Sequence, residues 1–233
     1  MDIRNLHPWN IPASQAIGVQ ADLVRQLSLH NDFDNIGIIA GADVALDPKT
    51  GLGYAAVVLL SYPSLEPIEV AVSKHKIEFP YVPGLLSFRE GPILTEAFER
   101  LDKEPDLIFF DGNGVAHPRG LGIASHMGLV FDKPTIGVAK SKLLGNCKIP
   151  GRKEGDSSDL IYKGKKVGYA VRSKTGTAPI FVSPGHKIDY ETALRLTLTC
   201  VDGLRVPKPT RLADAVAEAA KKGKEKDLIK KLK

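Results

Sequence analysis

Three consecutive strand-like segments, with no room for a helix between them, constrain the fold of this chain most strongly. They span residues 36–46, 53–61 and 68–77 and are rich in aliphatic residues. The first connection, Asp47 to Gly51, has the Pro and Gly chemistry of a turn. Strands joined by short connections pair antiparallel, because parallel neighbours require a crossover of a dozen residues or more. We therefore predict an antiparallel meander at one side of a sheet.

A different pattern follows the meander. A helical pattern at 92–101, with a proline in its first turn, precedes a short apolar strand at 106–110. A second helical pattern at 121–130 precedes another buried strand at 134–139. This alternation implies parallel strands with helices on both faces. The sequence therefore predicts an α/β fold with a mixed central sheet flanked by helices.

The remaining segments extend this prediction. Residues 12–27 have the apolar spacing of a helix, and the polar, Gly-rich residues 145–165 are expected to form a loop. Further strands and helices are expected near the C-terminus, at 167–171, 179–183, 190–201 and 211–222.

Length and composition limit the class of protein. A chain of 233 residues with 43% hydrophobic residues is long enough for one cored domain, or at most two small ones. No apolar stretch reaches the roughly 18 residues of a membrane helix, and the N-terminus lacks a signal-peptide pattern. Cys147 and Cys200 form neither a disulfide framework nor a zinc ligand set. We expect a soluble, cytoplasmic, monomeric protein without a membrane partner.

The charge is unevenly distributed along the chain. The formal net charge is +5, but residues 133–174 hold 11 basic and 3 acidic side chains. Such a segment is typical of a surface that faces a polyanion, and the alternative is a solvated lysine surface. The tail at 221–233 holds seven lysines and two acids, which is the composition of a flexible segment or a non-specific DNA tether.

Two aspartates stand where an apolar strand would exclude them. Asp43 lies within the first strand, and Asp111 directly follows the apolar residues 107–110 and precedes Gly112. A buried carboxylate needs a cation, a metal or hydrogen-bond donors, because burying it unpaired costs several kcal/mol. Ligands also lie beyond the carboxyl ends of parallel strands. The structural alternatives are a strand-end cap for Asp43 and an Asp-Gly turn for Asp111.

Glu90 and Asp214 are the other two candidate acids. Ser87 and Glu90 have the spacing of a capping box, and Asp214 falls in the first turn of a predicted helix, so both have structural interpretations. If the acids at 43, 90, 111 and 214 converge, they form the oxygen-rich site that Mg²⁺ prefers.

Other polar residues suit phosphate chemistry. His117 and Arg119 supply a proton carrier and an anion-binding guanidinium after the Asp111 loop. Lys140 follows the strand at 134–139, at the same predicted sheet edge as Asp111, and its alternative is an exposed loop lysine. Tyr81 lies in a stiff Pro-rich loop, where its ring either wedges into a base stack or packs against the protein.

Together these motifs closely resemble the endonuclease V family. The resemblance covers about residues 15–220, in order, and it implies a ribonuclease H-like fold. It places the nuclease domain at 1–222 and leaves a lysine-rich, flexible tail at 223–233. The motifs that carry it are Ile39–Asp43, Pro80–Glu90, Asp111–Arg119, Gly122–His126, Pro134–Lys140, Arg172–Lys174, Gly185-His186 and Pro209–Asp214.

The resemblance also implies a function. Members are Mg²⁺-dependent DNA repair endonucleases, with Mn²⁺ as a substitute, that recognise deaminated bases such as hypoxanthine in deoxyinosine. They hydrolyse the second phosphodiester bond 3′ to the lesion and leave 3′-hydroxyl and 5′-phosphate ends. An inosine-specific ribonuclease with the same site is one alternative, and a non-catalytic binding module is another.

The resemblance assigns roles to individual residues. Asp43 and Asp111 are implied as principal metal ligands, with Glu90 and Asp214 completing the acidic site. His117 and Lys140 are implied to lie beside the scissile phosphate. Tyr81 resembles the wedge that separates the strands. The substrate-binding residues are then Tyr81, Pro83, Gly84, Leu86, Gly112, Arg119 and Ile123.

Overall fold

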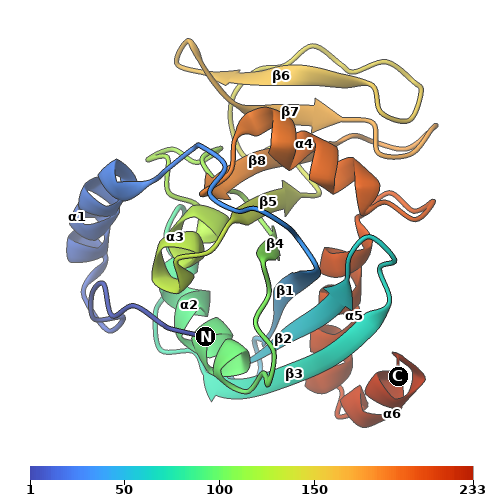
Figure 1. Ribbon diagram of the computed structural model, residues 1–233. Helices are drawn as coiled ribbons and strands as arrows, with labels where there is room; N and C mark the ends of the chain where they lie inside the picture. The colour runs from blue at the N-terminus through green and yellow to red at the C-terminus, as the bar shows by residue number, and fades with distance from the viewer. Residues whose placement is uncertain (233) are drawn as a thin grey trace.

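The fold is built on one mixed sheet of eight strands with helices packed on it (Figure 1). The computed structural model describes residues 1–232. The strand order is β3-β2-β1-β4-β5-β8-β7-β6. β4 and β5 run parallel to β1, and all other neighbours pair antiparallel. The strands are β1 (Ile38–Asp47), β2 (Leu52–Ser61), β3 (Pro67–Lys76), β4 (Leu107–Asp111), β5 (Thr135–Ala139), β6 (Ser157–Tyr162), β7 (Lys165–Val171) and β8 (Ile180–His186).

The predicted meander is confirmed as β1, β2 and β3. The turn after β1 is held by Asp47, whose carboxylate accepts hydrogen bonds from the Lys49 amide at 2.9 Å and the Thr50 hydroxyl at 2.8 Å. The parallel section is confirmed as well, with Ala42 of β1 in register with Phe110 of β4. The meander and the parallel strands thus form one continuous sheet.

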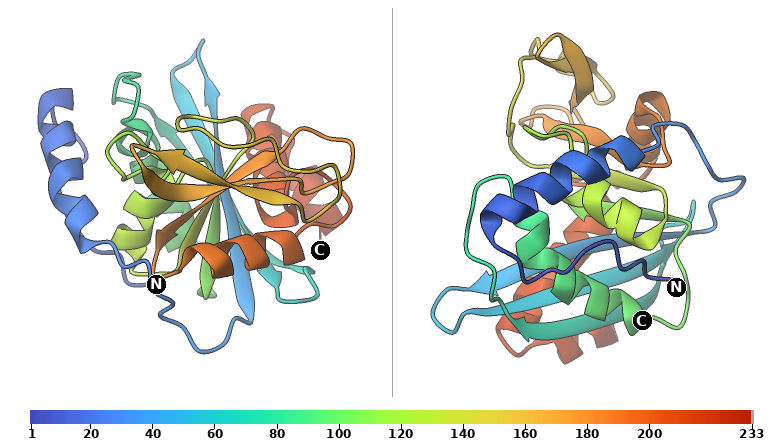
Figure 2. Two further views of the ribbon diagram at one scale, coloured as in Figure 1. Left: turned by 90° about the horizontal axis from the view of Figure 1, so that it is seen from above. Right: turned by 90° about the vertical axis from the view of Figure 1, so that its left-hand side faces the viewer.

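Helices cover both faces of the sheet, as Figure 2 shows. Alternate residues of β4 pack to opposite sides: Leu107 and Phe109 join the core beneath α4 and α5, whereas Ile108 and Phe110 join the core beneath α2 and α3. Because both faces of β4 are buried, the residues of this strand from Leu107 to Phe110 are all apolar. One layer contains α1 (Ala13–Leu23), α2 (Leu86–Glu99) and α3 (Ile123–Phe131), and the other contains α4 (Tyr190–Thr199), α5 (Lys208–Lys221) and α6 (Glu225–Leu232).

The start of α2 differs from the sequence prediction. The helix begins at Leu86, so Pro92 lies inside it rather than in its first turn. The buried residues Ile93 and Leu94 hold this helix against the sheet, and Phe88 packs in a separate cluster with Ala16 of α1. Tertiary packing of this kind overrides a local proline signal. Ser87 and Glu90 therefore form no capping box, and the Ser87 hydroxyl instead lies 2.8 Å from His126 Nδ1.

Two other segments also differ. Part of the expected loop at 145–165 forms β6, an edge strand whose polar residues gave no strand signal. The expected flexible tail contains α6, in which Leu228, Ile229 and Leu232 pack against the core beneath α4 and α5. An eight-residue amphipathic pattern interrupted by lysines is too short to predict a helix from spacing alone.

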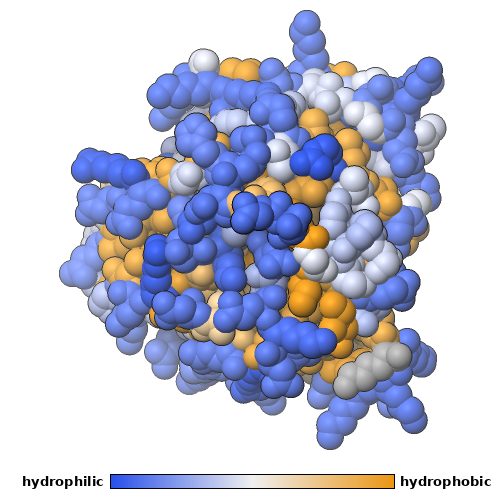
Figure 3. All heavy atoms as spheres, viewed as in Figure 1, coloured by the Kyte–Doolittle hydropathy of each residue, from blue (hydrophilic) through white to orange (hydrophobic). Residues whose placement is uncertain are grey.

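The surface is mainly hydrophilic on the face shown in Figure 3, where smaller hydrophobic areas lie between the hydrophilic residues. No helix within residues 1–232 is long and apolar enough to span a bilayer.

Candidate active site

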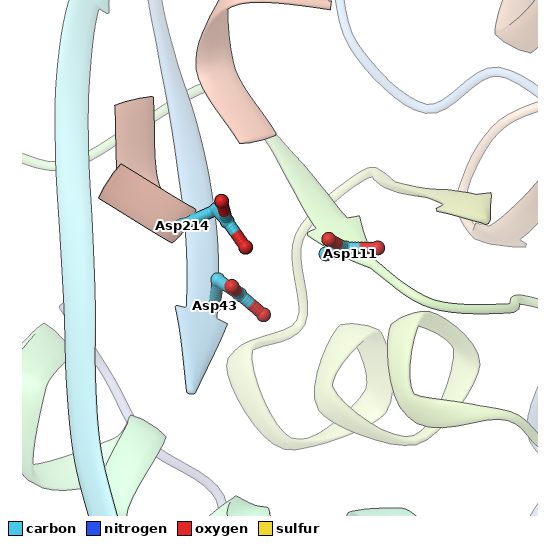
Figure 4. Close-up of side chains that lie close together, drawn as sticks. All are labelled: Asp43, Asp111 and Asp214. Atoms are coloured by element: carbon cyan, nitrogen blue, oxygen red, sulfur yellow. The ribbon is translucent and has the colours of Figure 1, made fainter. Parts of the chain in front are cut away.

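Three of the four predicted acids converge. Asp43, Asp111 and Asp214 each offer a carboxylate oxygen that lies within 4.8 Å of the other two, and they form the one such group of His, Cys, Asp or Glu within residues 1–232. Figure 4 shows the three side chains directed toward a common space, from β1, from the end of β4 and from α5. We call these three residues the carboxylate group.

The alternation of side chains along neighbouring strands accounts for two of the three positions. Ala42 of β1 lies beside Phe110 of β4 in the parallel pairing, so the next residues, Asp43 and Asp111, occupy equivalent positions on the two strands. Both acids therefore point to the same face, since successive side chains alternate across a sheet. That face is the one covered by α5, which brings Asp214.

Gly41 allows α5 to approach the sheet closely. A Cβ atom at position 41 would lie 1.9 Å from the carbonyl oxygen of Pro209, so only glycine fits beneath the start of α5. Gly41 and Asp43 lie two residues apart and share a face of β1. The close contact at Gly41 is thus what places Asp214, one turn further along α5, opposite Asp43.

Lys140 lies within the carboxylate group. Its ammonium Nζ is 2.6 Å from Asp111 Oδ2 and 3.2 Å from Asp214 Oδ1. Burial by itself lowers the pKa of Lys140, but hydrogen bonds and attraction to these two carboxylates outweigh it and raise the pKa above its ordinary value. The lysine therefore remains charged and cancels one of the three negative charges.

Lys140 leaves two of the three negative charges uncancelled, and the protein accommodates them poorly. Burial, followed by repulsion from Asp111 and then Asp214, raises the pKa of Asp43 to about 8. A group of carboxylates that repel each other in this way needs a further cation, and oxygen ligands of this kind favour Mg²⁺ over softer metals. The chemistry of the donor set therefore fits a hard divalent metal ion.

Glu90 lies outside the carboxylate group. It comes from α2, in the helix layer on the opposite face of the sheet, and only 8% of its surface is exposed. Burial, and then the negative charge of Asp43, raises the pKa of Glu90 to about 8. The carboxyl is close enough to sense Asp43 and Asp111 electrostatically, but the structure does not bring it into the group of three.

A pocket of about 210 Å³ lies between the Pro-rich loop before α2 and the loop after β4. Tyr81 lies at the pocket, with 75% of its surface exposed and the Arg89 guanidinium 5.9 Å from the centre of its ring. Predicted substrate residues in the lining are Tyr81, Pro83, Gly84, Leu86 and Ile123, together with His117.

The loop after β4 connects the carboxylate group to the pocket. Gly112 directly follows Asp111, and a Cβ atom on it would lie 2.7 Å from Ile123 of the pocket wall. Its φ of +153° is also a value that L side chains rarely adopt. Gly114 lies against β8, where a Cβ atom would approach the carbonyl oxygen of Pro184 to 2.0 Å. Close packing thus holds the pocket beside the acids.

His117 and Arg119 lie at the pocket rather than in the carboxylate group. Burial, and then the charge of Arg119, lowers the pKa of His117 to about 4, although a hydrogen bond to the backbone of Gly84 opposes this effect. His117 is therefore neutral at neutral pH. Arg119 donates from Nη2 to the Gly84 carbonyl at 2.6 Å, so its guanidinium holds the pocket loop.

Sequence reasoning missed some residues of this region. Leu143 and Asn113 line the pocket, and Gln20 of α1 bonds to two of its segments. Gln20 interrupts the apolar side of the predicted first helix, and that is the signal by which it could have been found. His186, part of one of the family motifs, pairs with Thr135 at the start of β5, at the end of the strands opposite the carboxylate group.

Comparison with known proteins assigns the chain to a family. The family model described as endonuclease V matches residues 21–215. This chain belongs to the endonuclease V family. Endonuclease V from Kosmotoga olearia is 45% identical over 223 residues, which are 95% of this chain and 98% of that protein. The family's name describes its members as nucleases, so the assignment makes this protein a nuclease as well.

Solved endonuclease V structures share the fold. The Bacillus subtilis enzyme superposes with a TM-score of 0.91 at 32% identity, covering 97% of this chain and 100% of that chain. The Ciona intestinalis enzyme, in complex with a 23mer DNA containing an inosine followed by a ribo-adenosine, has a TM-score of 0.82 at 28% identity. It covers 91% of this chain and 99% of that chain. The predicted ribonuclease H-like architecture is therefore confirmed.

Proposed function

We propose that this endonuclease V recognises deaminated bases in DNA, above all hypoxanthine in deoxyinosine, and hydrolyses the second phosphodiester bond on the 3′ side. The observation that carries the proposal is the adjacency of a base-sized pocket and a carboxylate group, joined through Asp111 and Gly112. The inosine-containing DNA bound by the Ciona intestinalis enzyme supports the choice of base.

Asp43, Asp111 and Asp214 would hold Mg²⁺, or Mn²⁺ as a substitute, with Glu90 behind them. A bound divalent ion would supply Lewis-acid polarisation of the phosphate, an activated water and stabilisation of the leaving 3′ oxygen. Lys140 orients the two carboxylates that it contacts and presents a positive charge at the phosphate position. The products would carry 3′-hydroxyl and 5′-phosphate ends.

The pocket would receive the flipped base. Its walls combine backbone from Gly84 and Gly122 with apolar side chains such as Leu86 and Ile123, a lining that suits a planar base. Hypoxanthine differs from adenine by its 6-oxo group and N1–H, which backbone donors and acceptors can distinguish. The exposed ring of Tyr81 would fill the space that the base leaves in the stack.

A ribonuclease acting on inosine-containing RNA is the second candidate. The DNA bound by the Ciona intestinalis enzyme has a ribo-adenosine directly after the inosine, so that relative accepts a ribonucleotide at this position. The carboxylate group and pocket would serve both substrates, and the sugar preference would distinguish them.

Four matched oligonucleotides test the proposal: deoxyinosine and deoxyadenosine DNA strands, and inosine and adenosine RNA strands, each with Mg²⁺, Mn²⁺ or a chelator. We expect metal-dependent cutting of the deoxyinosine strand at the second bond. Equal cutting of the deoxyadenosine strand would refute base recognition, and a preference for the inosine RNA would favour the second candidate.

We also propose that residues 1–222 form the nuclease domain, with α6 packed on it, and that the protein is a cytoplasmic DNA repair monomer.

A further inference from the structure

Gln20 is a buried polar residue with a complete set of hydrogen bonds. It lies on α1 with 1% of its surface exposed. Its Nε2 donates to the carbonyl oxygens of Gly84 at 3.0 Å and Leu121 at 3.2 Å, and its Oε1 accepts from Arg119 Nε at 2.5 Å. One side chain of a helix remote in sequence thus joins two segments that line the pocket.

The Gly84 carbonyl is the centre of this arrangement. It accepts from Arg119 Nη2 at 2.6 Å as well as from Gln20, and His117 also hydrogen-bonds to the Gly84 backbone, so these donors together fix its direction. Gly84 has a φ of +79°, a left-handed conformation that glycine adopts readily. Because such a residue has few preferences of its own, these hydrogen bonds, together with the one from the Leu85 amide to the Val82 carbonyl oxygen at 3.0 Å, orient the peptide after it.

The orientation of that peptide affects the pocket. Leu86 and Ser87 line the pocket and form the first turn of α2, so their amide groups have no acceptor within the helix. Free amides at a helix start are donors for an oxygen or ring nitrogen of a ligand. Fixing Gly84 therefore fixes the position of these amide donors. The hydrogen bond from Gln20 to the Leu121 carbonyl fixes the distance to the opposite wall of the pocket.

We propose that Gln20 is a positioning residue for base recognition, which acts with Arg119 to orient Gly84 and to set the separation of the two pocket walls. The inference rests on the proposed function of the pocket. It assigns Gln20 an effect on which base is accepted and how tightly, without contact with the substrate or the carboxylate group.

The chemistry of the side chain explains why glutamine is required. Glutamate would keep the acceptor for Arg119 but could not donate to the two carbonyls, and its charge would repel them. Methionine has similar length and removes all three bonds, which leaves two buried carbonyl oxygens without this donor. Gln15 lies on the same helix with an exposed side chain and offers matched controls.

The test compares Gln20→Met and Gln20→Glu with Gln15→Met and Gln15→Glu. Cleavage of deoxyinosine and deoxyadenosine strands is measured for each, with separate kcat and KM. We expect the Gln20 variants to raise KM for the deoxyinosine strand about tenfold and to reduce the inosine-to-adenine preference similarly, with kcat little changed. Deuterium exchange should accelerate in residues 80–87 and 117–122. The Gln15 variants should match the wild type in all of these measurements.

Each outcome has a defined meaning. Unchanged KM and preference in the Gln20 variants, or a loss confined to kcat, would overturn the inference. If Gln20→Met does not fold, as judged by thermal unfolding, Gln20→Glu decides by the same criteria. If the wild type shows no inosine preference, the proposed function fails, and faster exchange in the two loops then decides the positioning role by itself.

Discussion

Replacing Gly41 with alanine tests whether the seating of α5 on β1 determines the active site. A Cβ atom there would lie 1.9 Å from the Pro209 carbonyl oxygen and 2.8 Å from the Pro209 Cα. Because real Cβ atoms essentially never approach to within 3.0 Å, the two backbones must separate by at least about 1.1 Å. β1 is hydrogen-bonded on both sides, to β2 and to β4, so we expect α5 to move.

The displacement reaches the carboxylate group. Asp214 lies five residues after Pro209 on the same helix, so it moves away from Asp43 and Asp111 with α5. A misplacement of about 1 Å at a catalytic group costs roughly 100-fold in rate. Overpacking of this kind also lowers the free energy of unfolding by about 1–3 kcal/mol. The Gly41→Ala enzyme should therefore be folded at moderate temperature but about 100-fold slower.

The assay is single-turnover cleavage of a deoxyinosine strand, measured well below the unfolding midpoint of each variant, together with urea unfolding. Gly18→Ala is the matched control, because a Cβ atom at this position of α1 meets nothing within 4 Å. We expect it to cleave like the wild type and to be as stable or up to about 1 kcal/mol more stable. Wild-type cleavage by Gly41→Ala, with unfolding like that of the control, would refute this reasoning.

Three further predictions test other parts of the site. Asp43→Asn and Asp111→Asn should each reduce cleavage at least roughly 100-fold while binding to inosine DNA persists, and near-normal rates in either would exclude it as a ligand. Tyr81→Ala should weaken binding to an inosine duplex about tenfold, because stacking is lost, and unchanged affinity in a binding titration would contradict the wedge. Burial, and then the neighbouring His7, lowers the pKa of His126 to about 3. Below about pH 6.5, His126 therefore binds a proton in the unfolded chain but not in the folded protein. The free energy of unfolding must then fall as the pH decreases from about 6.5. Between pH 7 and 5.5 the wild type should lose roughly 1 kcal/mol more in urea unfolding than His126→Asn, and equal losses would contradict this explanation.

The alternation of strands and helices was predictable because it depends on local periodicity. The meander and the parallel strands β4 and β5 lie close to their predicted positions. The start of α2 was not predictable, because Pro92 is tolerated only through the packing of Ile93 and Leu94 from the same helix against the sheet. α6 likewise depends on a core surface that its own eight residues do not reveal.

The candidate site was predictable to different degrees. Asp43 and Asp111 gave local signals, since each is an acid in or directly after an apolar strand. Lys140 and Asp214 had ordinary structural explanations in the sequence, and their contacts with each other and with Asp111 and Asp43 distinguish them from surface charges. Gln20 gave only the signal of a polar residue on the apolar side of a helix, and its role was not readable because its partners lie 64 to 101 residues away.

The amino-acid sequence by itself determined the order of elements, the mixed sheet, two of the acids and the family resemblance, since burial patterns and motifs are properties of neighbouring residues. The tertiary structure decided which acids meet, that Glu90 lies outside their group, and that His117 belongs to the pocket. These distances depend on how closely remote backbones can pack. The contact between Gly41 and Pro209 shows the reason, because a single absent methyl group allows α5 to complete the site.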